Sequence, residues 1–438
     1  MLRKFLAALG LVALVFTAGA FDLREHGSIL PGLGGRPIEA VVDVPLTGDS
    51  TGYAAFAINR CRFLLGKRRK ACYEELLLAT VARQHVRLAM DGLSIISRRD
   101  PETQKYGHDL THVVGINAWT PDEAVGPVYD SCTGLFQSGC YHGVVQAYLD
   151  AQGTDSTTVY GLCNQINSAA TNAWLRFQCV HGIGHGLVSN MAMHLPKALA
   201  GCDWLVREWD ATSCYGGAFM EFIVAARGQS HHPHKPAVAA AEEQDHDGHD
   251  MSAMAADSFP ARNRADPLYP CSVLAPKYQS ACYGMQAGII IEIVGADFGK
   301  IAKACDQAPL GMRPACYQGV GTYVSGYVVR NQKKAIKQCE KGSPEYRAWC
   351  FVGVVKNLID VTALPDEGLS FCARLTDRAL AVACYTAIGE QMGILFPNFD
   401  QREAQCAKAP APFIPACRYG AVLIGERPPG LTPFVPTT

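Results

Sequence analysis

The sequence predicts an all-α protein, a disulfide-stapled α-solenoid of about ten helical hairpins in the manner of TPR and Sel1-like superhelices. Two observations lead to this prediction. The 18 cysteines are even in number and fall into local pairs. In the C-terminal half these pairs recur with a fixed period, and each pair brackets a short turn between two stretches of helical spacing. A constant period of this size is typical of helical-hairpin repeats.

The cysteine spacing defines the repeat. In the C-terminal half, paired cysteines are 11 or 12 residues apart, and equivalent cysteines of successive pairs are 33 or 34 apart. The N-terminal pairs follow the rhythm less strictly, and the intervals from Cys72 to Cys140 and from Cys214 to Cys282 are both 68 residues. Each interval therefore has room for a repeat without cysteines. A disulfide within a pair would staple one hairpin across its turn and stabilise it by about 2–3 kcal/mol. The nine expected pairs are Cys61/Cys72, Cys132/Cys140, Cys163/Cys179, Cys202/Cys214, Cys271/Cys282, Cys305/Cys316, Cys339/Cys350, Cys372/Cys384 and Cys406/Cys417.

One unit, residues 297–329, illustrates the hairpin: "DFGKIAKACDQAPLGMRPACYQGVGTYVSGYVV". Its first part has helical spacing through Cys305 and ends in a turn rich in Pro and Gly. Pro314 then stands where a first-turn proline opens a second helix. Cys305 falls near the end of the first helix and Cys316 near the start of the second.

The pattern resembles Sel1-like repeats in the cysteine-rich form found in secreted Helicobacter cysteine-rich proteins. The matching residues are Ala304-Cys305 with Ala315-Cys316-Tyr317 and Gly319, Cys339 with Cys350 and Gly353, Cys372 with Ala383-Cys384-Tyr385, and Cys406 with Ala416-Cys417. The resemblance covers most of residues 55–425 and places the chain in a divergent branch. It implies a right-handed α-solenoid that acts as an interaction scaffold. Some cysteine-rich members of the family are linked to β-lactam or haem binding.

The chain is expected to be exported, to the periplasm or the extracellular space. It begins with MLRK, an apolar run and Ala18-Gly19-Ala20, which are the three regions of a signal peptide. An oxidising compartment also suits the cysteine content. No stretch has the length of a membrane span, and the formal net charge of −1 offers no argument for nucleic acid as a partner.

The expected segments are a signal peptide (1–20), a Gly/Pro-rich segment (21–52), histidine-bearing repeats (53–227), a His/Asp-rich insertion (228–266), cysteine-paired repeats (267–427) and a Pro-rich tail (428–438).

The histidines of the N-terminal half follow the repeat. Three reference points are used: Cys140, Cys179 and Tyr106, the midpoint of the interval from Cys72 to Cys140. Counted from them, His108, His142 and His181 share one position of the repeat. His112 and His185 share a second position, four residues after the first. Residues four apart lie on one face of a helix, and equivalent helices of a solenoid lie side by side. The expected metal ligands are therefore His108, His112, His142, His181 and His185, with the Glu221 carboxylate. An auxiliary capture site is expected in the insertion, at His231, His232, His234, His246 and His249.

Neutral imidazole is a common ligand of copper, zinc and iron, so the first hypothesis is an exported transition-metal protein, with redox or metal-activated chemistry possible. The alternative is a non-enzymatic scaffold with a protein partner on its concave face. Non-covalent haem binding is a third option. His-Glu-x-x-His, Gly-x-Ser-x-Gly and Ser-x-x-Lys motifs are absent, which argues against zincins, serine hydrolases and β-lactamases. Whether the protein is an enzyme stays open, as does the identity of its catalytic residues.

Overall fold

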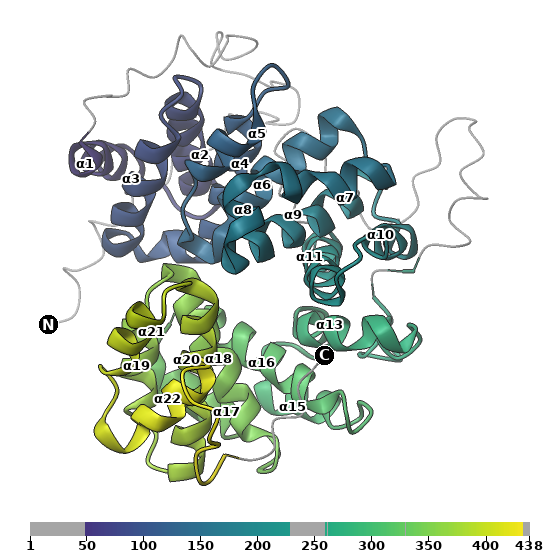
Figure 1. Cartoon of the computed structure of the whole chain (residues 1–438), viewed down its shortest axis with the longest axis vertical. Coiled ribbons are helices and arrows are strands. Elements are labelled where there is room, and N and C mark those ends of the chain that lie inside the picture. The colour runs from purple at the N-terminus through teal and green to yellow at the C-terminus, as the bar shows by residue number, and fades with distance from the viewer. Residues whose placement is uncertain (1–48, 228–258, 261, 329, 432–438) are drawn as a thin grey trace, which may run out of the picture. The chain divides into compact units, whose positions relative to one another are not determined.

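The computed structural model describes residues 49–227, 259–260, 262–328 and 330–431, which belong to one compact unit. Every regular element in these residues is a helix and none is a strand (Figure 1). The all-α prediction is confirmed for this part of the chain. No described helix combines the length and the apolarity needed to cross a membrane. The predicted signal peptide, nearly all of the 21–52 segment, most of the insertion and the end of the tail lie outside the described residues.

From α15 to α20 the helices alternate between shorter ones of seven or eight residues and longer ones of 15 to 18. The N-terminal helices are α1 (Ser50–Cys61), α2 (Lys67–Val81), α3 (Val86–Arg99), α4 (Gly107–Ala118), α5 (Val125–Asp130), α6 (Leu135–Gln152), α7 (Ser156–Gln165), α8 (Asn167–Thr171), α9 (Ala173–Asn190), α10 (Leu195–Cys202) and α11 (Glu208–Ala226). The C-terminal helices are α13 (Pro276–Met285), α14 (Ala287–Val294), α15 (Phe298–Cys305), α16 (Arg313–Tyr327), α17 (Gln332–Cys339), α18 (Arg347–Thr362), α19 (Asp366–Cys372), α20 (Arg378–Leu395), α21 (Phe399–Cys406) and α22 (Ile414–Gly420). Two 3₁₀ turns span Pro101–Lys105 and Ala411–Phe413.

Nine disulfides link cysteines that are neighbours in the sequence, and they use all 18. In most of them, a cysteine in the last turn of a short helix is joined to a cysteine in the following long helix. Their Cα–Cα separations are 5.5 to 5.9 Å, the usual range for a disulfide. The pairs are Cys61–Cys72, Cys132–Cys140, Cys163–Cys179, Cys202–Cys214, Cys271–Cys282, Cys305–Cys316, Cys339–Cys350, Cys372–Cys384 and Cys406–Cys417.

Local sequence signals set the ends of the hairpin helices. Asp297 accepts hydrogen bonds from the first backbone N–H groups of α15, and Asn331 and Asn398 cap α17 and α21 in the same way. Proline occupies the first turn of α13 and α16, at Pro276 and Pro314. Proline suits this position because its missing N–H would have no partner inside the helix.

The long helices pack on one another in chain order, α4 on α6, α6 on α9, α9 on α11, α11 on α13 and onward to α22. Glycines permit this close approach. A methyl group on Gly184 in α9 would overlap the carbonyl oxygen of Cys214 in α11, and one on Gly217 would overlap that of His181. The same reciprocal contact joins α16 to α18 and α20 to α22. The glycines three residues after Cys214, Cys350 and Cys417 are therefore part of the packing between successive long helices.

The two 68-residue intervals have different contents. Between Cys72 and Cys140 lie α3, α4 and the short α5, and α4 packs between α2 and α6 as part of a hairpin without cysteines. Between Cys214 and Cys282, α11 packs directly against α13, so the described residues of that interval add no further hairpin to the stack. The extra length there falls largely within 228–258, outside the described residues.

Candidate metal centre

Four histidines from α4, α6 and α9 form a buried group that can hold a metal ion. Each of His108, His112, His142 and His185 offers one ring nitrogen, and these atoms all lie within 4.8 Å of one another. The ring centroids of His108 and His112 are 4.6 Å apart, and those of His112 and His185 are 5.0 Å apart. His112 and His185 are fully buried. The helices that supply these residues are neighbours in the N-terminal half (Figure 1).

The two histidines of α4 each donate a hydrogen bond through Nδ1. His108 Nδ1 donates to the carbonyl oxygen of Phe136 at 2.8 Å. His112 Nδ1 donates to Oε1 of Gln146 at 2.9 Å. A neutral ring that donates from Nδ1 carries its lone pair on Nε2. Both rings are therefore set in the tautomer that presents Nε2 as a ligand atom.

The other two histidines are oriented in the same manner from α9 and α11. His142 Nε2 donates to Oε1 of Gln178 at 3.0 Å, which leaves the lone pair on Nδ1. His142 Nδ1 is buried and has no hydrogen-bond partner among the described residues. His185 Nδ1 donates to the Glu221 carboxylate at 2.9 Å. Metal-binding histidines characteristically donate their second ring nitrogen to a carbonyl or carboxylate that orients the ring.

The electrostatics favour uncharged rings. Burial, followed by the neighbouring His181, His185 and His108, holds the pKa of His142 well below its ordinary value of 6.5. Burial, followed by His185 and His108, lowers the pKa of His181 in the same way. Since a metal binds the neutral imidazole, these two rings are already in the ligand form near neutral pH.

His181 and Glu221, both expected as ligands, lie beside the four-histidine group and are not members of it. The His181 ring is 4.9 Å from that of His142 and 5.2 Å from that of His185. It hydrogen-bonds the backbone of Ser213, and its buried Nδ1 has no hydrogen-bond partner among the described residues. Glu221 is buried and accepts the bond from His185. Glu221 therefore orients a ligand, and His181 forms the edge of the cluster toward Phe177.

The register of the histidines differs from the prediction. A methyl group on Gly143 would overlap the carbonyl oxygen of His112, as one on Gly217 would overlap that of His181. His112 therefore shares the position of His142 and His181, two residues after the cysteine. The prediction that His108 shares this position is therefore wrong, and so is the prediction that His112 and His185 share another.

The cause of the shifted register is a short repeat. Gly115 meets the carbonyl of Cys140 in the way that Gly184 meets that of Cys214, so Leu110 stands where other long helices have a cysteine. Leu110 is only 30 residues before Cys140. The intervening helix α5 has six residues, and the Cys132–Cys140 loop is the shortest of the nine. His108 lies one helical turn before the shared position, and His185 lies one turn after it.

A left-handed turn at the start of α6 completes the site. Phe136, Gln137 and Ser138 have φ values of 51°, 55° and 63°, in a region that residues other than glycine rarely adopt. This turn presents the Phe136 carbonyl to His108. Gly139 follows, and a methyl group there would overlap Thr111 Oγ1 and come within 2.9 Å of the His112 ring. The absence of a side chain at Gly139 gives the His112 ring its space.

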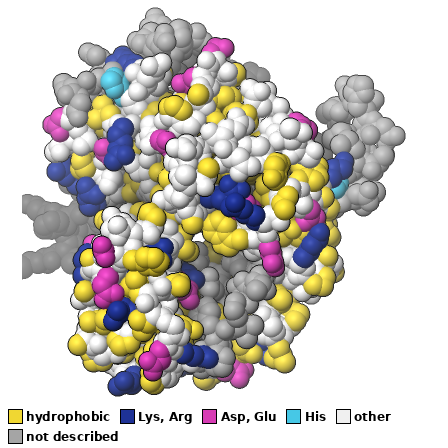
Figure 2. Space-filling model, viewed as in Figure 1, with side chains coloured by type: hydrophobic (Ala, Val, Ile, Leu, Met, Phe, Trp, Pro, Cys, Tyr) yellow, Lys and Arg dark blue, Asp and Glu magenta, His cyan; other side chains and the backbone are white. Residues whose placement is uncertain are grey.

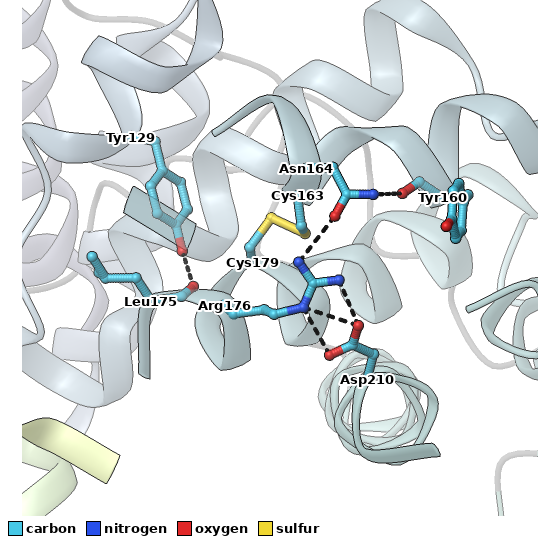
Figure 3. The surroundings of a disulfide bond; sticks show 8 residues. All are labelled: Tyr129, Tyr160, Cys163, Asn164, Leu175, Arg176, Cys179 and Asp210. Atoms are coloured by element: carbon cyan, nitrogen blue, oxygen red, sulfur yellow. Dashed lines mark hydrogen bonds and ion pairs between the residues drawn. A yellow bond between two sulfur atoms is a disulfide. The ribbon is translucent and has the colours of Figure 1, made fainter. Parts of the chain in front are cut away.

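An ion pair fixes α9 against α11 at the end nearest the Cys163–Cys179 disulfide (Figure 3). The Arg176 guanidinium donates to both carboxylate oxygens of Asp210, at 2.6 to 3.0 Å, and to Asn164. Both side chains of the ion pair are buried. This bidentate contact holds the helix that carries His185 in register with the helix that carries Glu221.

Sequence reasoning missed the amide partners Gln146 and Gln178. Gln146 is four residues after His142, and Gln178 is three before His181, so each shares a helix face with a histidine. That spacing is the signal that would have found them. The five predicted auxiliary residues, His231, His232, His234, His246 and His249, lie outside the described residues. On the face shown in Figure 2, acidic and basic side chains are interspersed and histidines are few.

No protein-family model, no curated protein and no solved structure matches the chain. The resemblance to Sel1-like repeats therefore stays a prediction.

Proposed function

We propose that this chain is an exported α-solenoid of about ten hairpins that binds one transition-metal ion through His108, His112, His142 and His185. The observation that carries the proposal is the pairing of each ligand nitrogen with a fixed acceptor on the other side of its ring. Packing alone would not require four histidines from three helices each to donate a hydrogen bond from one ring nitrogen, so that the other carries the lone pair. Nine disulfides support an oxidising, exported location.

The donor set indicates the class of metal. Four neutral nitrogen ligands suit zinc, copper, nickel or ferrous iron and not calcium or magnesium, which prefer oxygen. Ligand nitrogens around a four-coordinate zinc are about 3.3 Å apart, given bonds near 2.0 Å. The present separations of up to 4.8 Å require only a small contraction of the group around an ion.

The geometry favours a closed site. Catalytic zinc typically has three protein ligands and an open position, whereas four protein ligands are typical of a structural site. We therefore infer that the ion is held for storage, delivery, electron transfer or stability and does not activate water. The rings contact one another at 4.6 to 6.4 Å between centroids, which suits an ion better than a porphyrin lying between them. A protein partner for the solenoid surface stays a prediction.

The test is the metal content of the exported protein. We expect wild-type protein purified without chelators to carry about one transition-metal ion per chain, and His142→Ala to lose at least tenfold in affinity. His85→Ala is the matched control, because His85 is exposed and lies outside the cluster. The proposal fails if wild-type protein, after metal is supplied, binds no more tightly than a His112→Ala/His142→Ala double variant that is still helical by circular dichroism.

A further inference from the structure

The loop between α1 and α2 exposes two large apolar side chains at its tip. Phe63 is 78% exposed and Leu65 is 77% exposed, although they are only two residues apart. Isolated exposed apolar residues are common on proteins and need no explanation. Two exposed apolar side chains at the tip of one five-residue connection between helices do need an explanation.

The loop is held rigidly from beneath. The Cys61–Cys72 disulfide closes its base. Arg69 donates from Nε to the carbonyl of Leu64 at 2.7 Å and from a terminal nitrogen to the carbonyl of Arg62 at 2.5 Å. The same guanidinium is fixed by Asp100 at 3.0 Å. Two backbone carbonyls are thus turned inward, and the side chains between and beyond them, Phe63 and Leu65, remain on the solvent side.

Basic side chains surround this tip. Arg60, Arg62, Lys67 and Arg68 are exposed, and none of them forms an ion pair with a described residue. Residues 56–72 contain no Asp or Glu. The cluster is local, because the whole chain has a formal net charge of only −1. We call Arg60, Arg62, Phe63, Leu65, Lys67 and Arg68 the tip patch.

We propose that the tip patch binds the surface of a membrane that contains anionic phospholipid. Phe and Leu at the end of a convex, rigid loop can enter the headgroup–acyl boundary without any folding of the loop. The four cations beside them would contact lipid phosphates, with their aliphatic stems lying along the apolar side chains. Arg62 already stacks on Phe63, with its guanidinium carbon 4.6 Å from the ring centroid. A rigid loop has little conformational entropy to lose on binding.

Vesicle co-sedimentation tests the proposal, with the exported protein in its purified form. Vesicles of phosphatidylcholine mixed with phosphatidylglycerol are compared with vesicles of phosphatidylcholine alone, at low and at high salt. We expect binding to the anionic vesicles only, weakened by salt. Phe63→Ala/Leu65→Ala should lower the partition coefficient at least tenfold, and loss of the four charges should lower it by about fivefold per charge.

Matched variants elsewhere on the chain control for general effects. Leu310→Ala/Phe399→Ala removes two similarly exposed side chains, and Lys333, Lys334, Lys337 and Lys341 changed to Gln remove four exposed charges. Both controls should bind as wild type does. The proposal is overturned if wild-type protein ignores anionic vesicles, or if the tip variants bind as wild type does. Binding to polyglutamate but not to vesicles would overturn it in favour of an acidic protein partner.

Discussion

In the N-terminal half α9 and α11 approach each other through Gly184 and Gly217, and in the C-terminal half α16 and α18 do so through Gly321 and Gly353. The backbone contacts are the same in both halves. The residues two after the cysteine, or after Leu110 where no cysteine stands, differ: three N-terminal helices have His112, His142 and His181, and three C-terminal helices have Gln318, Val352 and Thr386. The comparison teaches that glycine, cysteine and apolar residues carry the packing, so that this one position is available for chemistry.

The largest expected effect tests whether the two halves depend equally on glycine for the close packing of their long helices. Gly184→Ala and Gly321→Ala should each destabilise their own half by about 3 kcal/mol, because the added methyl group overlaps a carbonyl oxygen of the next helix. Hydrogen–deuterium exchange measured on separate helices would show faster exchange in α9 and α11 for the first variant and in α16 and α18 for the second.

Two other glycines provide the controls. Gly161 in α7 and Gly326 in α16 have open space on the side where a methyl group would be added. Alanine at either position should stabilise its helix slightly, by about 0.5–1 kcal/mol. A strong effect of Gly184→Ala with none for Gly321→Ala would break the comparison.

The second prediction distinguishes the two halves by how much stability metal restores to each. Removing Cys163–Cys179 or Cys339–Cys350, each as a double alanine variant, should cost about 3 kcal/mol by the loop-entropy model. Metal at about 100 times its dissociation constant should restore roughly 2.7 kcal/mol to the first variant, since His185 lies on the helix affected. It should restore nothing to α17 and α18 in the second. Hydrogen–deuterium exchange measured on separate helices, with and without metal, tests this, and equal protection of α9 in the first variant and of α18 in the second would contradict the placement of the site.

The third effect is a loss of stability in acid that is confined to the histidine half. Burial lowers the pKa of His142 and His181 in the folded chain below the unfolded value of 6.5. The unfolded state then binds protons that the folded state does not, so stability present above pH 6.5 is lost as the pH falls. Metal-free protein should lose about 2 kcal/mol between pH 7.5 and pH 5.5, first in α6 and α9.

Exchange rates at the two pH values, corrected for the intrinsic pH effect, measure this loss. A His142→Gln/His181→Gln variant should show a flatter pH dependence whatever its absolute stability. An equal acid response in the variant would show that other groups are responsible.

The smallest expected effect has the opposite sign and belongs to the C-terminal half. Burial raises the pKa of Asp360 to about 7, outweighing Lys356 and the hydrogen bond from Gln391. The folded state therefore holds a proton that the unfolded state releases, and stability falls as the pH rises from about 4 to 7. Asp360→Asn should gain about 1 kcal/mol at pH 8 and nothing at pH 4. Thermal denaturation measures the gain, with exposed Asp122→Asn as the control; a gain at pH 4 would contradict the assigned cause.

Both the helical class and the metal hypothesis could be reached from the sequence for a local reason. Cysteines 11 residues apart, such as Cys305 and Cys316, mark one helix end and the next helix start, whatever the rest of the chain does. His181 and His185 lie on one helix face by spacing alone. The placement of the four-histidine group between α4, α6 and α9 agrees with the predicted patch, although its exact membership does not.

The sequence by itself determined the helical hairpins, the spacing of the cysteine pairs and the presence of a histidine patch, because each depends on contacts between residues close in the chain. Only the tertiary structure decided the register of His108 and His112, since no cysteine marks Leu110. It also decided the contents of the two 68-residue intervals. Equal lengths hold a hairpin in one case and none among the described residues in the other. The roles of Gln146, Gln178 and Glu221 were settled in the same way, because they depend on which helices approach through glycine and which ring nitrogens then face an acceptor.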